Sequence, residues 1–371
     1  MSERPALTPL VQTLPATVPF VGPEAQERAR GRPFRARLGA NENGFGPSPQ
    51  VVEAMRAAAP EMWKYCDPEN HELKQALAAH HGIKAGNITV GEGIDGLLGL
   101  VVRQYCEPGA PIVTSLGAYP TFNYHVAGFG GRLVTVPYEN DRENLDGLLE
   151  AARRENARIV YLSNPDNPMG TWWQAGEVQR FMEALPETTL LILDEAYCET
   201  APASALPPLD LSRPNVLRMR TFSKAYGLAG MRCGYAVGEE ETIRAFDKVR
   251  NHFGVTRMAQ AAGLAALADR AHLRGVVEAV EACRRRIIGI AEAHGLTPLP
   301  SATNFVTMDC GGDGAFALKV LQALTERDVF VRKPMAPVLD RCIRVSVGPE
   351  PEIAIFEAEL RPALEAALRQ S

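Results

Sequence analysis

Apolar residues in the middle of the chain form short runs, separated by segments of helical periodicity. Several runs are apolar at consecutive positions, which is typical of strands covered on both faces. The predicted strands are residues 88–90, 111–114, 132–136, 158–163, 189–193, 216–221 and 233–237. The predicted helices between them are residues 95–106, 146–156 and 174–184. This alternation favours an α/β fold with a mostly parallel sheet and helices on both faces.

The pattern changes on either side of this region. The first forty residues are rich in proline and arginine and show weak periodicity, so we interpret them as an arm. After Thr242 the pattern is mainly helical up to His294, and it is followed by short predicted strands and a last helix from Glu352. These last strands are residues 305–309, 329–331 and 344–347. We therefore predict an arm over residues 1–40 that joins the small domain, a large domain over 41–255, and a smaller α+β domain over 256–371.

Composition excludes several classes of protein. The 371 residues are 46% hydrophobic and 22% charged, as in soluble globular proteins. The net charge of -5 comes from acidic and basic residues mixed along the chain, which gives no support for nucleic-acid binding. No apolar stretch is long enough for a membrane span, and Arg4, Pro5 and Pro9 interrupt any signal peptide. Seven scattered cysteines without a Cys-x-x-Cys motif favour a cytoplasmic protein with no zinc site.

A glycine-rich turn at residues 91–96 follows a predicted strand and opens a helix. Free amide groups and the helix dipole at such a turn favour a bound phosphate. A dinucleotide site also needs an acidic residue at the end of the next strand. That strand is followed by Ser115 and Leu116, so the turn indicates a cradle for a single phosphate. A plain helix start with Asp95 as the N-cap fits the same residues.

Lys224 lies where an apolar strand leads into a glycine-rich loop. Most lysines are solvated surface residues, but this one has Ser223 beside it and Arg232 eight positions later. An amine at the carboxyl end of a strand can form a Schiff base with an aldehyde cofactor, provided that its pKa of about 10.4 is lowered. Ser223 and Arg232 would suit a phosphate group on that cofactor.

Asp194 ends the apolar run 190–193. Such a carboxylate usually caps a loop, yet ligands of open α/β sheets bind at the carboxyl ends of strands. A buried carboxylate there could hold a pyridinium N–H and keep the ring an electron sink. Tyr197 could reach a hydroxyl group of that ring. Asn167 could do the same, although residues 164–170 also fit an ordinary proline turn.

In order and spacing, these segments resemble the fold-type I pyridoxal-phosphate aminotransferases. Residues 41–49, 221–230 and 342–348 resemble the histidinol-phosphate aminotransferase branch of that family, and the resemblance covers nearly the whole chain. It implies pyridoxal 5'-phosphate as the cofactor, bound to the large domain, and a homodimer with shared active sites. It also implies ping-pong transfer of an amino group by Schiff-base chemistry. Histidinol phosphate is the best expectation for the donor and 2-oxoglutarate for the 2-oxo acid, with a place in histidine biosynthesis.

The resemblance also implies a role for each matching residue. Lys224 would bind the cofactor and carry the proton, Asp194 would pair with the ring nitrogen, and Tyr197 would hold the ring oxygen together with Asn167. Tyr119 would stack on the ring. The cofactor phosphate would be bound by Gly93, Ile94, Asp95, Ser223 and Arg232, with Tyr65 contributed by the other subunit. The substrate would contact Phe20, Asn41, Arg332 and Arg344, with Arg344 taking its carboxylate or phosphate.

Three departures from the branch concern the donor. Phe20 occupies a place where tyrosine is common, Gly44 replaces a usual proline, and the turn 91–96 lacks the usual Ser-Asp-Glu. An aminotransferase for aromatic or other amino acids is therefore an alternative. A decarboxylase or racemase on the same scaffold is another, against which the Arg344 carboxylate site argues. A nicotinamide oxidoreductase lacks its ribose acid, and a non-catalytic protein would have little reason to keep Lys224.

Overall fold

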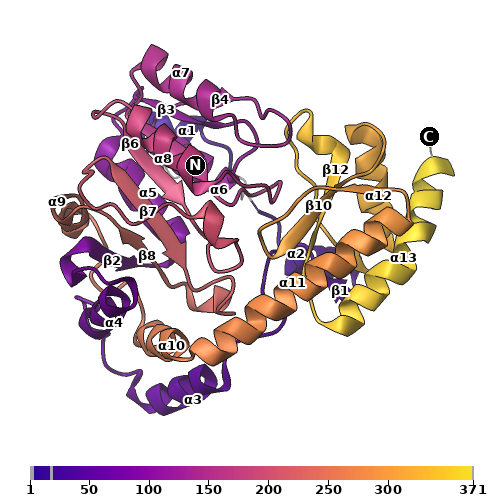
Figure 1. The fold of residues 1–371 in the computed structure, drawn as a ribbon, viewed down its shortest axis with the longest axis horizontal. Coiled ribbons are helices and arrows are strands. Elements are labelled where there is room, and N and C mark those ends of the chain that lie inside the picture. Colours follow the sequence, from indigo (N-terminus) through magenta and orange to yellow (C-terminus); the bar gives the residue numbers. More distant parts are fainter. Residues whose placement is uncertain (1–3, 17–19, 370–371) are drawn as a thin grey trace.

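The computed structural model describes residues 4–16 and 20–369, and its centre is a seven-stranded sheet (Figure 1). The strand order is β2-β8-β7-β6-β5-β3-β4. The strands are β2 (Ile88–Gly91), β3 (Pro111–Ser115), β4 (Arg132–Val136), β5 (Ile159–Ser163), β6 (Leu190–Asp194), β7 (Val216–Thr221) and β8 (Gly234–Val237). β8 is antiparallel to both neighbours and the remaining pairs are parallel, which confirms the mostly parallel sheet.

Helices cover both faces of this sheet. One face packs against α5 (Gly93–Tyr105) and α6 (Pro120–Gly128) in a cluster that includes Leu97, Phe122 and Ile192. The other face packs against α7 (Leu145–Glu155) and α8 (Ala175–Ala184) in a cluster that includes Leu148 and Phe181. Every residue of β5 and β6 is buried because both faces are covered. The strands are apolar at consecutive positions because both of their faces are buried.

Most helices of the sheet region begin at a side chain that binds the first free amides. Ser48 caps α3 (Pro49–Ala58), and Asn144 caps α7 by accepting from the amide of Gly147. α8 begins with a capping box. The remaining helices of this region are α4 (His71–His81), α9 (Glu240–Arg244) and α10 (Arg257–Ala268). α5, like α4 and α6, lacks such a cap: its N-cap residue Glu92 makes no side-chain cap bond, which leaves the first amides available.

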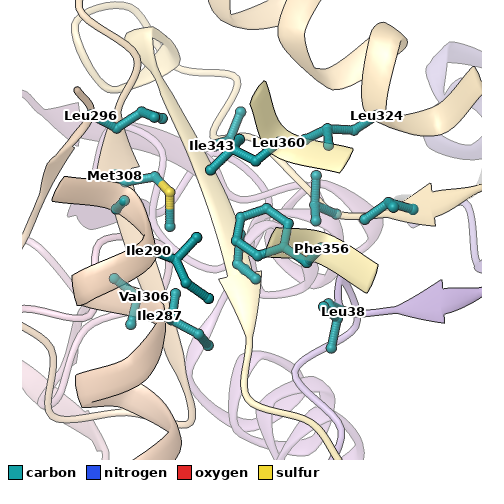
Figure 2. Close-up of a cluster of buried hydrophobic side chains, with 14 of the residues drawn as sticks. Leu38, Ile287, Ile290, Leu296, Val306, Met308, Leu324, Ile343, Phe356 and Leu360 are labelled. Carbon is teal, nitrogen blue, oxygen red and sulfur yellow. The ribbon is translucent and has the colours of Figure 1, made fainter. Parts of the chain in front are cut away.

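The C-terminal part forms a second, smaller unit. Its three-stranded antiparallel sheet has the order β12 (Cys342–Ser346), β10 (Phe305–Asp309), β9 (Thr297–Pro298). The helices are α11 (Arg270–Ala293), α12 (Gly314–Glu326) and α13 (Glu350–Arg369), and α11 connects the two parts of the molecule (Figure 1). Figure 2 shows the core of this unit, in which Leu38 joins Ile290, Val306, Ile343 and Phe356 in one buried cluster. This unit combines helices with short strands, as the sequence pattern predicts.

The N-terminal residues contact both parts of the molecule. In α1 (Pro9–Thr13), Leu10 lies beside Gly130 of the large sheet region. α2 (Pro23–Arg30) and β1 (Ala36–Arg37) join the small unit, where β1 pairs in parallel with β11 (Val329–Phe330). The domain boundaries at 40 and 255 stay predictions. α10 packs with α3 and α4 in a cluster that includes Val51, Leu73 and Ala259.

Short 3-10 helices complete the secondary structure. They are η1 (Ala59–Glu61), η2 (Ala85–Asn87), η3 (Ala203–Ala205), η4 (Ala229–Met231), η5 (Ala245–Lys248) and η6 (Leu339–Arg341). All seven cysteines carry free thiols. Within residues 4–16 and 20–369, no helix is long and apolar enough to cross a membrane, and no cluster of side chains has the make-up of a metal site.

Candidate active site

The predicted site residues converge at the edge of the sheet where β2, β5, β6 and β7 end. β2 leads into the start of α5, β5 into the loop 164–170, β6 ends at Asp194, and β7 leads to Ser223 and Lys224. These four strands run in the same direction, so their carboxyl ends lie together. In open α/β sheets this edge is the usual place for a ligand.

Lys224 is the amine of this site. Its Nζ donates a hydrogen bond to the backbone oxygen of Asn41 (3.1 Å) and lies 5.5 Å from the ring centre of Tyr197. Burial lowers the pKa of Lys224 to about 8, and the positive charge of Arg344 acts in the same direction. The nearby carboxylate of Asp194 acts against this shift. The amine can therefore lose its proton near neutral pH, as a nucleophile or base must.

Asp194 is a carboxylate on the floor of the site, and only 6% of it is exposed. Its Oδ2 accepts a hydrogen bond from the hydroxyl of Tyr161 (2.7 Å), and its Oδ1 accepts one from the amide of Ala196 (2.9 Å). Burial raises the pKa of Asp194 to about 6, whereas the two hydrogen bonds and Lys224 oppose the rise. The structure therefore brings Lys224 and Asp194 into electrostatic contact within one site.

Asn41 and Tyr197 lie beside the lysine. The Asn41 amide nitrogen donates to the Tyr197 hydroxyl (3.2 Å), and the Asn41 side-chain oxygen accepts from Ser346 (3.0 Å). Asn41 has a φ of 55°, a left-handed conformation that asparagine tolerates better than most residues. Asn304 holds the same segment through bonds to the backbone oxygens of Asn41 and Glu42. Burial raises the pKa of the Tyr197 hydroxyl, so it remains a donor.

The start of α5 forms a cradle for an anion. Gly93 has a φ of 76°, and a Cβ atom at this position would lie 2.8 Å from Nη2 of Arg232. The arginine thus lies against the uncapped helix start. Ser223 is buried nearby, where its Oγ accepts from the hydroxyl of Thr221 (2.9 Å). Backbone amides, a guanidinium group and a hydroxyl together match a phosphate.

The N-cap interpretation of Asp95 is wrong. Glu92 occupies the N-cap position, and Asp95 lies within the first turn of α5. Its carboxylate Oδ1 pairs with Nε2 of His125 (2.8 Å), so it is turned to α6 instead of the helix start. Tyr119 precedes α6 and is half-buried. Burial raises its pKa, and both Asp95 and Asp194 act on it electrostatically, which places Tyr119 among the site residues.

The arginines lie on the side of the small unit. Arg344 donates from Nη1 to Oδ1 of Asn167 (2.6 Å), and its buried Nε has no partner among the described residues. Burial lowers the pKa of Arg344 to about 10. Arg332 is joined to Arg344 through backbone hydrogen bonds and donates to the backbone oxygen of Val21 (3.2 Å). Its guanidinium lies over the ring of Phe20, 4.6 Å from the ring centre.

Tyr65 stands apart from the other predicted residues. It is 77% exposed, and its ring lies 4.7 Å from that of Phe253. Met62 and Trp63 are exposed on the same segment, and Trp63 is 79% exposed. No other subunit is present in the structure, so the contact of Tyr65 with a second active site stays a prediction.

Sequence reasoning missed the polar groups behind the site. Tyr161 lies within an apolar strand and Glu143 within a turn segment, and both side chains are buried. Glu143 accepts bonds from the hydroxyl of Ser115 (2.6 Å) and the amide of Ser163 (2.9 Å). Burial raises the pKa of Asp166, the residue before Asn167, to about 7. A polar side chain within a buried strand was the available signal for Tyr161.

A surface cleft of about 620 Å³ lies elsewhere, beside α7 and α8. Arg142, Trp173 and Arg180 are among its lining residues, and none of the predicted site residues is. The chemistry of the molecule therefore has to be sought at the sheet edge. There, the described side chains combine a half-buried amine, a buried carboxylate, an anion cradle and a half-buried arginine whose buried Nε has no partner.

Comparisons with known proteins agree with this arrangement. The family model for aminotransferase class I and II matches residues 36–357. A histidinol-phosphate aminotransferase from Mesorhizobium japonicum is 37% identical over 337 residues, covering 89% of this chain and 90% of the relative. One from Geobacillus thermodenitrificans is 36% identical, covering 84% of this chain and 85% of the relative.

A solved structure is similar over almost the whole chain. The histidinol-phosphate aminotransferase from Sinorhizobium meliloti, solved in complex with pyridoxal-5'-phosphate, is 57% identical with a TM-score of 0.95. The similarity covers 98% of this chain and 99% of that one. An aspartate aminotransferase from Rhizobium meliloti shares the fold at 21% identity and a TM-score of 0.80. The predicted fold class is therefore confirmed, and the chain belongs to the class I and II aminotransferases.

Proposed function

We propose that this aminotransferase moves an amino group from histidinol phosphate to 2-oxoglutarate, with pyridoxal 5'-phosphate as its cofactor. The bound cofactor supplies an aldehyde that links covalently to amines and a ring that withdraws electrons from the bond being broken. The observation that carries the proposal is the amine of Lys224 in electrostatic contact with the buried carboxylate of Asp194 at one edge of the sheet. The uncapped start of α5 with Arg232 provides the place for the cofactor phosphate.

Lys224 is the base of the proposed reaction. Its pKa of about 8 leaves an appreciable fraction of the amine neutral at neutral pH, so it can attack the aldehyde. With the cofactor bound, the neutral amine of Lys224 would be the group that accepts a proton from the substrate carbon and donates it again. Asp194 offers its carboxylate to the N–H of the ring. This pairing favours the ionised form of Asp194 over the protonated form that burial promotes.

A side-chain amide and a hydroxyl group are the proposed hydrogen-bond donors to the ring. Because Oδ1 of Asn167 accepts from Arg344, its Nδ2 remains to donate to an oxygen on the ring. The Tyr197 hydroxyl is held by Asn41 and can donate to the same oxygen. Tyr119 offers an aromatic face for stacking. These assignments rest on the positions of the side chains and on the family resemblance of their motifs.

Arg344 is the proposed site for the carboxylate of glutamate or 2-oxoglutarate. Its Nε is buried and has no partner among the described residues, which is costly unless a ligand fills the place. A carboxylate would supply that acceptor in a charge-assisted hydrogen bond. Arg332 lies next to it and would add positive charge for the phosphate of histidinol phosphate.

Aromatic amino acids are a second class of donor. The ring of Phe20 covers the guanidinium of Arg332 and offers no hydroxyl to a phosphate. Such a surface would pack favourably against an aromatic side chain. This observation bears on the choice of donor and leaves the roles of Lys224 and Asp194 unchanged.

A panel of donors tests these alternatives. Purified enzyme loaded with pyridoxal phosphate is mixed with histidinol phosphate, phenylalanine, tyrosine or glutamate, and the absorbance of the aldehyde form is followed. We expect the fastest bleaching with histidinol phosphate. Faster bleaching by phenylalanine would assign the enzyme to aromatic donors instead. Release of carbon dioxide without an amino-acid product would indicate a decarboxylase.

The functional unit is proposed to be a homodimer in the cytoplasm, without nucleic-acid or membrane partners. The exposed aromatic patch formed by Trp63, Tyr65 and Phe253 would be covered by the second subunit, and Tyr65 would reach the phosphate bound there. Sedimentation tests this directly: Trp63→Arg with Phe253→Arg should convert the dimer to monomers. Tyr65→Phe should leave the dimer intact and weaken cofactor binding. A monomeric wild-type enzyme with full activity would contradict the proposal.

A further inference from the structure

The register of the sheet places Tyr161 next to Asp194. β5 and β6 are parallel neighbours in which Tyr161 is paired with Ile192, so Asp194 comes two residues further along. Side chains two positions apart on a strand point to the same face. Tyr161 and Asp194 are thus diagonal neighbours on one face, at a separation that an aromatic side chain can bridge.

The hydroxyl of Tyr161 is held in place by packing. Tyr161 is 1% exposed, and its ring stacks on that of Phe122 with 4.6 Å between centres and 17° between planes. Phe122 lies in the first turn of α6, the helix whose N-cap residue is Tyr119. The hydroxyl reaches Oδ2 of Asp194 at 2.7 Å. With the amide of Ala196 on Oδ1, each oxygen of Asp194 has one donor from the protein.

We propose that Tyr161 is a positioning residue that aims the carboxylate of Asp194 at the cofactor ring and keeps it ionised. This inference rests on the proposed binding of pyridoxal phosphate with its ring nitrogen at Asp194. Donation to a carboxylate stabilises the charged form, which is the form that can pair with a ring N–H. The ring of Tyr161, through Phe122, also ties Asp194 to the helix that follows Tyr119.

Other charged and titratable groups act on the same carboxylate. They are Lys224 from the loop after β7, Glu195 from the end of β6, Glu143 from the segment before α7, Tyr197, and Tyr119 at the start of α6. Lys224 favours the ionised form, whereas the neighbouring carboxylates disfavour it. In the bound enzyme Lys224 would be linked to the cofactor. The hydrogen bond from Tyr161 would then carry more of the stabilisation of Asp194.

Tyr161→Phe is the decisive variant, because it removes one oxygen and leaves the ring against Phe122. Equilibrium dialysis of the cofactor-free protein would measure Kd for two probes at pH 6 and pH 8. The probes are pyridoxal phosphate and its analogue with carbon in place of the ring nitrogen. We expect Tyr161→Phe to raise Kd for pyridoxal phosphate by about 3- to 10-fold, more at pH 6 than at pH 8. Kd for the analogue should stay unchanged.

Tyr235→Phe is the matched control. Tyr235 is also buried in the large sheet, and its hydroxyl bonds Nε2 of His81 (2.9 Å) away from Asp194. This variant should change neither Kd. The proposal would be overturned if Tyr161→Phe reduced the affinity for both probes equally. It would also be overturned if the affinity for pyridoxal phosphate did not fall at pH 6.

Asp194→Asn separates this proposal from the assignment of the site. If Asp194→Asn binds pyridoxal phosphate like the wild type, the assignment of the ring nitrogen itself fails. If Asp194→Asn is impaired and Tyr161→Phe is not, only the role of Tyr161 fails. In the Asp194→Asn background, Tyr161→Phe should have no further effect. An additional loss there would show that Tyr161 acts through something other than this carboxylate.

Discussion

Asp194 and Glu195 are consecutive, buried carboxylates that have opposite environments. Glu195 is fully buried and accepts hydrogen bonds from Arg218 and from Nε of Arg220 (2.9 Å). Burial alone would raise its pKa, but the charges of Arg220 and Arg218 outweigh burial and hold the pKa below its usual value. Asp194 receives a tyrosine hydroxyl and an amide, and its pKa rises to about 6.

This difference in hydrogen-bond partners makes the charge of Glu195 structural, whereas the charge of Asp194 is one that a ligand can use. Glu195 has both of its counter-charges, Arg218 and Arg220, within the fold, so its carboxylate needs no partner from outside. Asp194 is left without a full counter-charge of its own, because Lys224 opposite must be free to react. Two adjacent acids at the end of β6 therefore have different surroundings: Glu195 forms ion pairs with two arginines, and Asp194 is the proposed binding group of the site.

The largest expected effect comes from removing the amine opposite Asp194. Lys224→Ala should lower the rate of amino transfer by about 10⁴-fold or more, because it removes both the nucleophile and the base. The rate is measured with glutamate and a 2-oxo acid. Lys248→Ala, which changes an exposed lysine, is the control and should keep wild-type activity. Enzyme with the cofactor bound to its lysine should be yellow. If Lys224→Ala kept this absorbance, another lysine would hold the cofactor.

The next effect concerns stability. Glu195→Ala should reduce the free energy of unfolding by about 3–5 kcal/mol, because Arg218 and Arg220 would be left buried without their counter-charge. Urea denaturation of the cofactor-free protein measures this value. Asp194→Asn should cost less than about 1 kcal/mol in the same assay. If both substitutions destabilise the protein equally, the distinction between the two carboxylates does not hold.

A smaller effect is expected at Arg344, on the opposite wall of the site. Arg344→Ala should raise KM for 2-oxoglutarate by about 10- to 100-fold, since it removes charge-assisted hydrogen bonds to the carboxylate. Kd for pyridoxal phosphate should change by less than about 3-fold. Steady-state kinetics and equilibrium dialysis supply the two values. Comparable losses in both would remove the proposed role of Arg344 in substrate binding.

The smallest effect is the pH dependence of stability. The folded pKa of Asp194, about 6, lies above the value of about 3.9 for an unfolded chain. Between these values the folded state holds the proton and the unfolded state does not, so this contribution to stability falls as pH rises from 4 to 6. Relative to Asp194→Asn, the cofactor-free wild type should therefore lose about 2 kcal/mol from pH 4 to pH 7. A constant difference over this range would contradict the raised pKa.

The sequence predicted the strands better than the helices. The bounds of β4, β7 and β10 match the predictions, although β7 carries Arg218 and Arg220 among its apolar residues. The helix Pro120–Gly128 was omitted because its apolar and polar residues show little separation into faces. The predicted start of α5 was displaced because the helix begins at Gly93, a glycine in a left-handed conformation, after an N-cap residue, Glu92, that makes no side-chain cap bond.

For the proposed site, sequence patterns predicted the groups to which we assign the chemistry and missed the groups that hold them in place. Lys224 and Asp194 could be recognised because each follows an apolar strand. The contact between Tyr161 and Asp194 depends on which residues of β5 and β6 are paired, and no local pattern contains that register. The partners of Glu195 were hidden for the same reason, since Arg218 and Arg220 come from the next strand.

The pairing of β1 with β11 has a consequence for the order in which the protein is made. Ala36 lies beside Val329, almost the whole length of the chain away, and Leu38 completes the core of the C-terminal unit. During synthesis, this early segment has no β11 to pair with until well after the last strand of the seven-stranded sheet, β8, has been made. The residues that follow it, including Asn41 beside Lys224, can reach their final places only when synthesis is nearly finished. A nascent chain therefore has no working catalytic centre until its last portion has emerged.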